Sequence, residues 1–324
     1  MNPLLSGVVV HWRNEEQLAE LTAAWPRDPR FELVVVDNDS EGGSEGELAL
    51  GPARLVRPGR NLGFAGGANA GIAEARAPIV LILNPDAVPE PGALESLLQG
   101  FAEHPDAAGL APRLNGPRGE PQWAWQLRRL PTPGALLRHT LPLGGGDGGL
   151  AAEPPAGAPV EQPAAAALAL RRSALEAVGG FDDGFWPAWF EDVDLARRLA
   201  AAGLVLRYWP AARFRHGLGS TVPRLGYGPF LSIYYRNLVR YLARHHGAGW
   251  ALAARLLLIP GMLIRLLLLP LRRPARARSR GEAFRGIFMV LEGAVTGWGP
   301  PSPPSPSLPR GAGEGAPSRR RSRK

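Results

Sequence analysis

Residues 33–40 read LVVVDNDS, an apolar run that ends abruptly in acidic and polar residues. Two further runs have the same character, GVVV at residues 7–10 and IVLIL at residues 79–83, and the second is followed by NPD at residues 84–86. Short, continuous runs of this kind, alternating with helical patterns, are typical of parallel strands that are covered on both faces. The sequence therefore predicts an α/β fold with a mostly parallel sheet.

The composition excludes several classes of site. The chain has 324 residues, 45% of them hydrophobic, and it contains no cysteine. This is the composition of a globular protein, and the lack of cysteine excludes disulfides, thiolate zinc sites and cysteine nucleophiles. Residues 1–10 lack the basic and apolar segments of a signal peptide, so we expect the N-terminal domain to stay in the cytoplasm.

The formal net charge is +8, and much of the excess lies late in the chain, at residues 272–280 and 319–324. Basic clusters of this kind favour contact with anionic lipid or nucleic acid. No nucleic-acid reader motif accompanies them, so we expect no nucleic-acid partner. We interpret residues 299–324, which are rich in Pro, Ser, Gly and Arg, as a disordered basic tail.

Acidic residues follow two of the predicted strands, where open α/β sheets bind their ligands. Asp37 and Asp39 follow the second strand, and a carboxylate there can accept hydrogen bonds from a nucleotide base or a ribose. Asp86 follows the third strand and offers an oxygen ligand for Mg²⁺ or Mn²⁺ beside a diphosphate. Both segments also suit simple turns.

A glycine-rich segment, NLGFAGGANAG at residues 61–71, lies between these two strands. Glycine lets the backbone approach a ligand closely, and we expect a helix that opens near Gly66 to point its amide donors outward. The glycine spacing differs from the G-x-G-x-x-G dinucleotide fingerprint, and the segment does not follow the first strand.

The densest acidic cluster is EDVDL at residues 191–195, directly after the aromatic segment FWPAWF at residues 185–190. Acidic residues favour helix starts for dipole reasons alone, but one of these can also act as the general base that deprotonates an acceptor hydroxyl. The aromatic side chains can stack on a sugar ring. His216 follows a predicted strand at residues 205–208 and is either structural or a nitrogen ligand of the metal.

Taken in this order, these segments resemble family 2 of the inverting glycosyltransferases, which has the GT-A fold, and most closely its rhamnosyltransferase-like branch. The resemblance covers roughly residues 5–225 and rests on VVVDNDS at 34–40, the segment at 61–71, NPD at 84–86, GGFD at 179–182, EDVDL at 191–195 and His216. The sequence departs from the family pattern in HWRN at residues 11–14 and in QPAAA at residues 162–166.

The resemblance implies a single displacement with inversion at the anomeric carbon, and Mg²⁺ or Mn²⁺ as cofactor. Asp192 would be the catalytic base, held in position by Glu191 and Asp194, while Asp86 and His216 would hold the metal. The residues expected to line the donor pocket are Asp37, Asp39, Asn61, Gly63, Gly66, Gly67, Asn69, Asn84 and Trp189.

The implied function is transfer of a sugar from a nucleotide-diphosphate sugar to a cell-surface glycan or a lipid-linked acceptor. The expected donor is dTDP-rhamnose, followed in order of preference by a UDP-hexose and a GDP-sugar. Two alternatives stay open. One is a sugar nucleotidyltransferase, which usually needs a basic Gly-rich loop directly after the first strand, and the other is a non-catalytic membrane scaffold that retains the fold.

Residues 251–271 are apolar and long enough to span a membrane, but they include Arg255, Pro260 and Arg265. Basic clusters on both sides favour a segment that lies flat on the inner face of the cytoplasmic membrane. The alternative is a pair of core helices broken at Pro260. The predicted organisation is a nucleotide-sugar-binding catalytic domain at 1–228, a helical membrane-associating region at 229–298 and the tail at 299–324.

Overall fold

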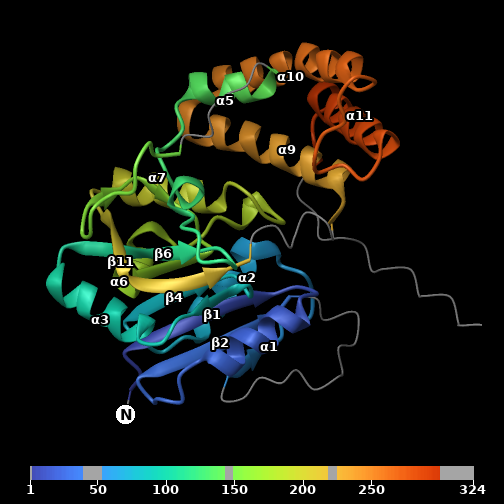
Figure 1. Ribbon diagram of the computed structural model, residues 1–324. Coiled ribbons are helices and arrows are strands. Elements are labelled where there is room, and N and C mark those ends of the chain that lie inside the picture. Colours follow the sequence, from blue (N-terminus) through green and yellow to red (C-terminus); the bar gives the residue numbers. More distant parts are fainter. Residues whose placement is uncertain (1, 39–52, 143–148, 218–224, 300–324) are drawn as a thin grey trace, which may run out of the picture.

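The computed structural model describes residues 2–38, 53–142, 149–217 and 225–299. Figure 1 shows a sheet domain below a separate layer of helices. Within the described residues, nine strands form the main sheet in the order β3-β2-β1-β4-β10-β6-β11-β5, and β8 pairs with β11. They are β1 (Leu5–His11), β2 (Phe31–Asp37), β3 (Arg54–Val56), β4 (Ile79–Leu83), β5 (Ala87–Pro89), β6 (Ala107–Asn115), β8 (Pro159–Val160), β10 (Ala167–Arg171) and β11 (Val205–His216).

The strand directions confirm the predicted α/β fold with a mostly parallel sheet. Strands β1, β2, β3, β4, β6 and β11 run in one direction, and β5, β8 and β10 run in the other. The three predicted strands at residues 7–10, 33–36 and 79–83 lie within β1, β2 and β4. A small second sheet pairs β7 (Leu127–Arg128) with β9 (Gln162–Pro163).

Helices cover both faces of the main sheet and enclose two apolar cores. On one face, α1 (Glu15–Ala24) and α3 (Ala93–Glu103) bury side chains such as Leu18 and Leu97. On the other face lie α2 (Gly63–Glu74), α6 (Arg172–Val178) and α7 (Glu191–Ala201), which contribute side chains such as Ala68 and Leu195. The central strands are therefore buried from both sides, which explains their continuous apolar sequence.

Helix α2 begins at Gly63 and not near Gly66, so the predicted helix start is wrong. The later glycines of this helix serve packing. A Cβ atom at Gly67 would lie 2.8 Å from Val10 Cγ1, and one at Gly71 would lie 2.9 Å from Val36 Cγ2. These glycines let α2 lie directly on β1 and β2, because any larger side chain would push the helix away from the sheet.

Four helices form the upper layer in Figure 1: α5 (Pro133–Thr140), α9 (Tyr227–His246), α10 (Ala248–Leu268) and α11 (Arg280–Thr296). They share a third apolar core, to which α5 contributes Leu136 and α9 contributes Leu238. Helix α10 runs without interruption through Pro260, so the alternative of two helices broken at that residue is wrong. The predicted boundary at residue 228 falls within α9, and residues 300–324 of the predicted tail lie outside the described residues.

Candidate functional site

The carboxyl ends of β1, β2 and β4 meet at one edge of the sheet. His11, the last residue of β1, is in register with Asp37 of β2, and Val9 is in register with Leu83 of β4. Strand β1 lies between β2 and β4, so the order of the strands reverses at β1. Open α/β sheets bind their ligands at such a topological switch point. Asp37 is 4% exposed there, with Arg57 Nε 3.9 Å from its Oδ2, whereas Asp39 lies outside the described residues.

Asp86 and His216 lie together at this edge, as the sequence predicted. His216 Nε2 is 3.5 Å from Asp86 Oδ1, and the Gly217 amide donates to the Asp86 carbonyl at 3.1 Å. The histidine ends β11, and Asp86 lies in the turn between β4 and β5, which pairs with β11. Within the described residues no group of three or more His, Asp or Glu side chains could hold a metal ion. No third side chain of these types therefore joins the Asp86–His216 pair.

The orientation of His216 is fixed by α4 (Trp123–Gln126) and the residue before it. Gln122 Oε1 lies 2.8 Å from His216 Nδ1, and Gln122 Nε2 donates to the His216 carbonyl at 3.0 Å. An amide oxygen only accepts, so Nδ1 carries the ring proton and Nε2 presents its lone pair towards Asp86. Trp125 stacks on the ring with a centroid distance of 5.3 Å. Burial lowers the pKa of His216 to about 4, which keeps the ring neutral at physiological pH.

Asp192 lies in the first turn of α7 and faces the segment that leads into β10. Its Oδ2 is 3.4 Å from both the Gln162 side-chain nitrogen and the Ala165 amide nitrogen. The Asn84 amide donates to the Ala166 carbonyl at 2.9 Å. Residues 165–166 therefore connect Asp192 to the strand end that carries Asp86. Burial raises the pKa of Asp192, and the nearby Arg128 guanidinium opposes this rise.

The two acids beside Asp192 have different surroundings. Glu191 is 8% exposed, and its Oε2 has no hydrogen-bond partner among the described residues. Burial, and then the neighbouring Asp192 charge, raises the pKa of Glu191 well above its ordinary value. Asp194 is fully buried and faces α9, where it pairs with His245 Nε2 at 2.7 Å and Arg244 Nε at 3.0 Å. Asp194 therefore fastens α7 to α9 and supports the start of α7 from behind.

Asn38, which directly follows β2, shapes the start of the glycine-rich segment. Its Oδ1 accepts from the Leu62 amide at 2.7 Å, and its Nδ2 donates to the Gly63 carbonyl at 3.0 Å. Asn61 Oδ1 accepts from the Gly63 amide at 2.8 Å. Gly63 has a φ of +71°, and a Cβ there would lie 2.7 Å from the Trp186 side chain. The segment is thus folded against the aromatic loop, at the same edge as Asp37.

Three other predicted donor-pocket residues make contacts within the fold. Asn69 uses both atoms of its amide group on the Phe181 backbone, accepting at 2.9 Å and donating at 2.8 Å. Gly67 is buried against Val10, and a Cβ at Gly66 would lie 2.9 Å from Leu62 Cβ. These contacts show how the three residues hold α2 in place, and their role in the donor pocket stays a prediction. Asn84 is half-buried at the end of β4, within the site edge.

The aromatic loop at residues 185–190 is held by α9. Asn237 is fully buried, and its Nδ2 donates to the carbonyls of Phe185, Ala188 and Trp189 at 3.0, 2.9 and 2.9 Å. Trp189 has a φ of +73°, an uncommon conformation for a non-glycine residue that needs external support. Its ring packs edge-on against Phe230 of α9 at 4.9 Å. Half-buried Trp189 is thus anchored on one side and partly open on the other.

Sequence reasoning missed the segment PQWAWQLRR at residues 121–129. It supplies Gln122 and Trp125 to His216, and Arg128 to the surroundings of Asp192. The segment has neither helical nor strand periodicity. Two tryptophans among glutamines and arginines were the available signal, because such side chains are costly to expose without a ligand or a packing role.

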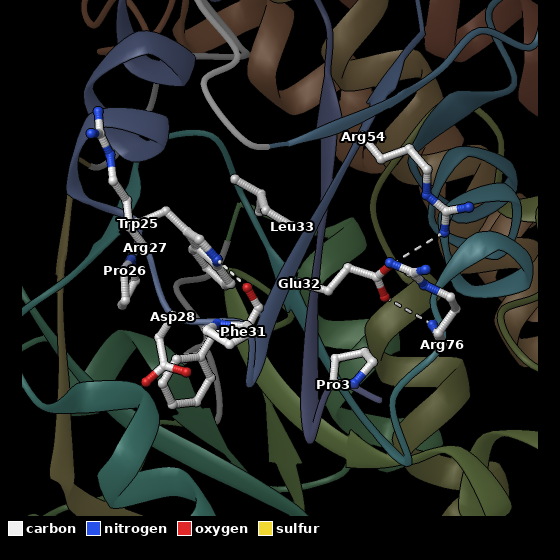
Figure 2. A pocket seen from close by; sticks show the side chains of 11 residues that line it. Pro3, Trp25, Pro26, Arg27, Asp28, Phe31, Glu32, Leu33, Arg54 and Arg76 are labelled. Carbon is white, nitrogen blue, oxygen red and sulfur yellow. Dashed lines mark hydrogen bonds and ion pairs between the residues drawn. The ribbon is translucent and has the colours of Figure 1, made fainter. Parts of the chain in front are cut away.

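A hollow of about 580 Å³ lies elsewhere, at the amino ends of β2 and β3. Figure 2 shows that Glu32 points between Arg54 and Arg76 there, and that Trp25 donates to the Phe31 carbonyl. Glu32 is thus paired with both arginines, and Asp28 is paired with Arg30 beside the hollow. Because it lies at the opposite end of the strands from Asp37 and Asp86, it is not part of the candidate site.

Comparisons with known proteins agree with this arrangement. Residues 8–152 match the model of glycosyl transferase family 2, a segment that includes Asp86 and Gln122 and ends before Asp192. An N-acetylglucosaminyl-diphospho-decaprenol L-rhamnosyltransferase from Mycobacterium tuberculosis is 29% identical over 284 residues, covering 82% of this chain and 91% of that protein. A pre-mycofactocin glycosyltransferase from the same species is 32% identical over 57% of this chain and 37% of its own length.

Among solved structures, Staphylococcus aureus TarS residues 1–349 in complex with UDP-GlcNAc has a TM-score of 0.50 and 14% identity. The match covers 91% of this chain and 83% of that one. At this identity the likeness concerns the fold, which is GT-A-like. The matched domain and the decaprenol rhamnosyltransferase relative support a rhamnosyltransferase-like protein of glycosyl transferase family 2.

Proposed function

We propose that the chain transfers a sugar from a nucleotide-diphosphate sugar to a lipid-linked saccharide, with inversion at the anomeric carbon. The observation that carries the proposal is the placement of Asp192 and the Asp86–His216 pair around one sheet edge, joined through residues 165–166. A transferase needs a base for the acceptor at one end of the reacting centre and positive charge for the leaving diphosphate at the other. A scaffold protein would need neither.

Asp192 is the proposed base. It takes the proton from the acceptor hydroxyl as that oxygen attacks the anomeric carbon, while the bond from this carbon to the diphosphate oxygen breaks. The products are the glycosylated acceptor and a nucleoside diphosphate, and the single displacement inverts the anomeric centre. The raised pKa of Asp192 makes it a stronger base than an exposed aspartate once it is ionised. Arg128 helps to keep it ionised.

The donor set of Asp86 and His216 fits Mg²⁺ or Mn²⁺. One carboxylate oxygen and one neutral imidazole nitrogen face each other at 3.5 Å, and the Gln122 contact holds the nitrogen in the ligating tautomer. Two protein ligands suit a cation whose remaining positions are filled by substrate phosphates and water. When bound, such a cation supplies positive charge for the departing diphosphate.

The remaining site residues serve the two substrates. We propose that Asp37 accepts hydrogen bonds from the nucleoside, with Asn61 and Gly63 closing the donor side and Trp189 facing the sugar or the acceptor. L-rhamnose is the preferred sugar and a polyprenyl-diphosphate saccharide the preferred acceptor, because the name of the 29% identical rhamnosyltransferase carries both. The family 2 domain argues against a sugar nucleotidyltransferase.

We also propose that the reaction takes place at the cytoplasmic face of the membrane, where the cytosolic donor meets the lipid-linked acceptor.

The test is a donor screen with the purified full chain. Release of nucleoside diphosphate is followed across dTDP-rhamnose, UDP-hexoses and GDP-sugars, with a lipid-linked acceptor and Mg²⁺ or Mn²⁺. We expect acceptor-dependent turnover that is greatest with dTDP-rhamnose and is abolished by excess EDTA. Full activity in EDTA would exclude the metal, and retention of configuration in the product would exclude the single displacement.

A further inference from the structure

The upper helical layer exposes an unusual amount of apolar surface. Leucines at residues 252, 256, 263, 267 and 271 recur every four or seven positions along α10 and its end, so they form one stripe on the helix. Leu267 is 77% exposed and Leu271 is 82% exposed. On α11, Phe284 and Phe288 are exposed, with their rings 4.9 Å apart. Apart from Leu4, the large hydrophobic side chains exposed within the described residues all lie between Trp250 and Val295.

The two arginines of α10 do not interrupt this stripe, because both turn towards neighbouring helices. Arg255 donates to the Ala294 carbonyl at 3.0 Å, near the end of α11. Arg265 donates to the Thr140 carbonyl at 2.7 Å, at the end of α5. Cationic groups at helix carboxyl ends satisfy unpaired carbonyls and interact favourably with the helix dipole. The arginines therefore hold α10 within the layer, while the leucines of the stripe are exposed.

These contacts decide how α10 meets a membrane. Its 21 residues, Ala248–Leu268, are long and apolar enough to cross one, and 28% of its most apolar stretch is buried. Crossing would require α10 to leave α5 and α11 and would strip Arg255 and Arg265 of their carbonyl partners in the hydrocarbon. Helix α9 cannot follow α10 inward either, because Asn237 and Arg244 are engaged by the aromatic loop and Asp194.

The charged residues around the stripe indicate what kind of surface the stripe binds. Between residues 248 and 299 the sequence has eight arginines and two glutamates. Five of these arginines, at positions 272, 273, 276, 278 and 280, are exposed in and beside the connection that follows α10. An apolar face bordered by exposed cations matches the two layers of an anionic bilayer, with acyl chains below and phosphate headgroups at the rim. A neutral apolar protein partner would not need the arginines.

We propose that the α10 leucine stripe, together with Phe284 and Phe288, docks this chain on an anionic lipid bilayer, with α10 in the plane of the membrane and not across it. The stripe would enter to the depth of the headgroup–acyl boundary, about 5–10 Å. Because α9 joins this layer to the aromatic loop, docking would hold the candidate site at a fixed position relative to the membrane surface. The inference shares its membrane location with the proposed function, but lipid binding tests it without any sugar transfer.

The test is flotation of the full chain with vesicles of phosphatidylcholine alone or with added phosphatidylglycerol. We expect binding that is much stronger with the anionic lipid. Leu267→Glu should weaken it at least tenfold, because it places a charge within the most exposed part of the stripe. Leu4→Glu is the matched control, since Leu4 is 44% exposed and lies far from the stripe in sequence and fold. It should bind as the wild type does, and circular dichroism should show both variants folded.

Three outcomes would overturn the proposal. Leu267→Glu could float as well as the wild type, which would remove the stripe as the docking surface. The reconstituted protein could resist alkaline carbonate extraction, with its C-terminus shielded from protease added on the side of the catalytic domain, which would show that α10 crosses the bilayer. Finally, the wild type could ignore both kinds of vesicle and form a dimer that Leu267→Glu dissociates, which would make the stripe a contact between two copies of the chain.

Discussion

The Asp192 carboxylate makes few contacts, so its substitution should affect activity without affecting folding. Its carboxylate accepts long hydrogen bonds of 3.4 Å from Gln162 and Ala165 and a local one of 2.8 Å from the Val193 amide. Asp192→Asn keeps the shape of the side chain but removes the base. We expect transfer to fall by about 10²-fold or more, the scale for loss of a positioned general base. Steady-state kinetics measures the loss.

Donor binding separates this outcome from a folding defect. Asp192→Asn should bind nucleotide sugar as the wild type does in calorimetry. Asp183→Asn, a change at an exposed aspartate of the neighbouring turn, should leave both binding and turnover unchanged. Near-normal turnover by a folded Asp192→Asn protein would remove Asp192 as the base.

Glu191 makes stability depend on pH. Its folded-state pKa is raised well above the ordinary value of 4.5, chiefly by burial. Between pH 4.5 and that raised value the folded chain holds a proton that the unfolded chain has released, so the free energy of unfolding falls as pH rises through this window. Glu191→Gln removes the titration. At neutral pH we expect the variant to be more stable by an amount on the order of 1 kcal/mol.

Urea unfolding from acid to neutral pH tests this expectation. The stability difference between Glu191→Gln and the wild type should vanish below pH 4.5, where both side chains are neutral. A difference that is constant with pH would mean that the gain comes from packing or from a new hydrogen bond of the amide, and not from the carboxylate.

Gln122 acts on the proposed metal site through His216. Gln122→Ala removes the acceptor for Nδ1–H and the donor to the His216 carbonyl. The ring can then rotate or change tautomer, and we expect Mn²⁺ affinity to fall by about 10–100-fold, the usual effect of losing such a partner. Electron paramagnetic resonance of free Mn²⁺ measures binding without turnover. Gln99→Ala, at an exposed position on α3, is the control; equal affinities in the two variants would contradict the role.

At the scale of elements, the sequence predicted the strands well and the contacts of the helices poorly. Strands β1, β2 and β4 are buried on both faces, and this alone produces the apolar runs that revealed them. The same sequence could not show that Gly67 packs on Val10, because a glycine suited to ligand approach is equally suited to helix–sheet approach. The contact between Asn69 and Phe181 could not be predicted either, because the two residues lie 112 positions apart in the sequence.

The candidate site was predictable in part. Asp86 and His216 lie together as expected, because each ends a strand or follows one at the same sheet edge. Gln122 and Trp125 were not predictable, because α4 is a short helix without periodicity. The dependence of the aromatic loop on α9 was hidden as well. Nothing local in residues 185–190 indicates that a buried asparagine from a distant helix supports their carbonyls.

Helix α9 should therefore influence the site from a distance. Asn237→Ala leaves three carbonyls of the aromatic loop, one buried and two partly buried, without their donor. We expect a loss of about 1–3 kcal/mol in the free energy of unfolding. We also expect transfer to fall more than stability alone explains, because Trp189 no longer holds its left-handed backbone conformation. Urea titration and kinetics at low temperature, where the variant is fully folded, measure the two effects. Unchanged kinetics in a destabilised protein would show that α9 serves folding only.

At the scale of the whole molecule, one continuous set of contacts runs from the sheet edge to the outer helix. Asp192 begins α7, Asp194 joins α7 to α9, and α9 packs on α10. Figure 1 shows α10 on the far side of this layer from the sheet. The molecule thus has the proposed donor-binding edge on the sheet and the apolar face in the helical layer, with α9 as the connection. This arrangement suits an enzyme whose two substrates come from different phases.

The separation of the sheet edge from the apolar helical layer predicts different effects on different acceptors. If docking through the α10 stripe serves encounter with a lipid-linked acceptor, Leu267→Glu should act on that substrate alone. We expect its apparent KM for an acceptor embedded in anionic vesicles to rise by about tenfold or more, because surface attachment raises the effective concentration of the acceptor. With a short-chain, water-soluble acceptor, kcat and KM should equal those of the wild type. Leu4→Glu should match the wild type on both substrates. Equal losses of Leu267→Glu on the two acceptors would place the damage in the catalytic domain, and no loss on either would mean that docking does not assist transfer.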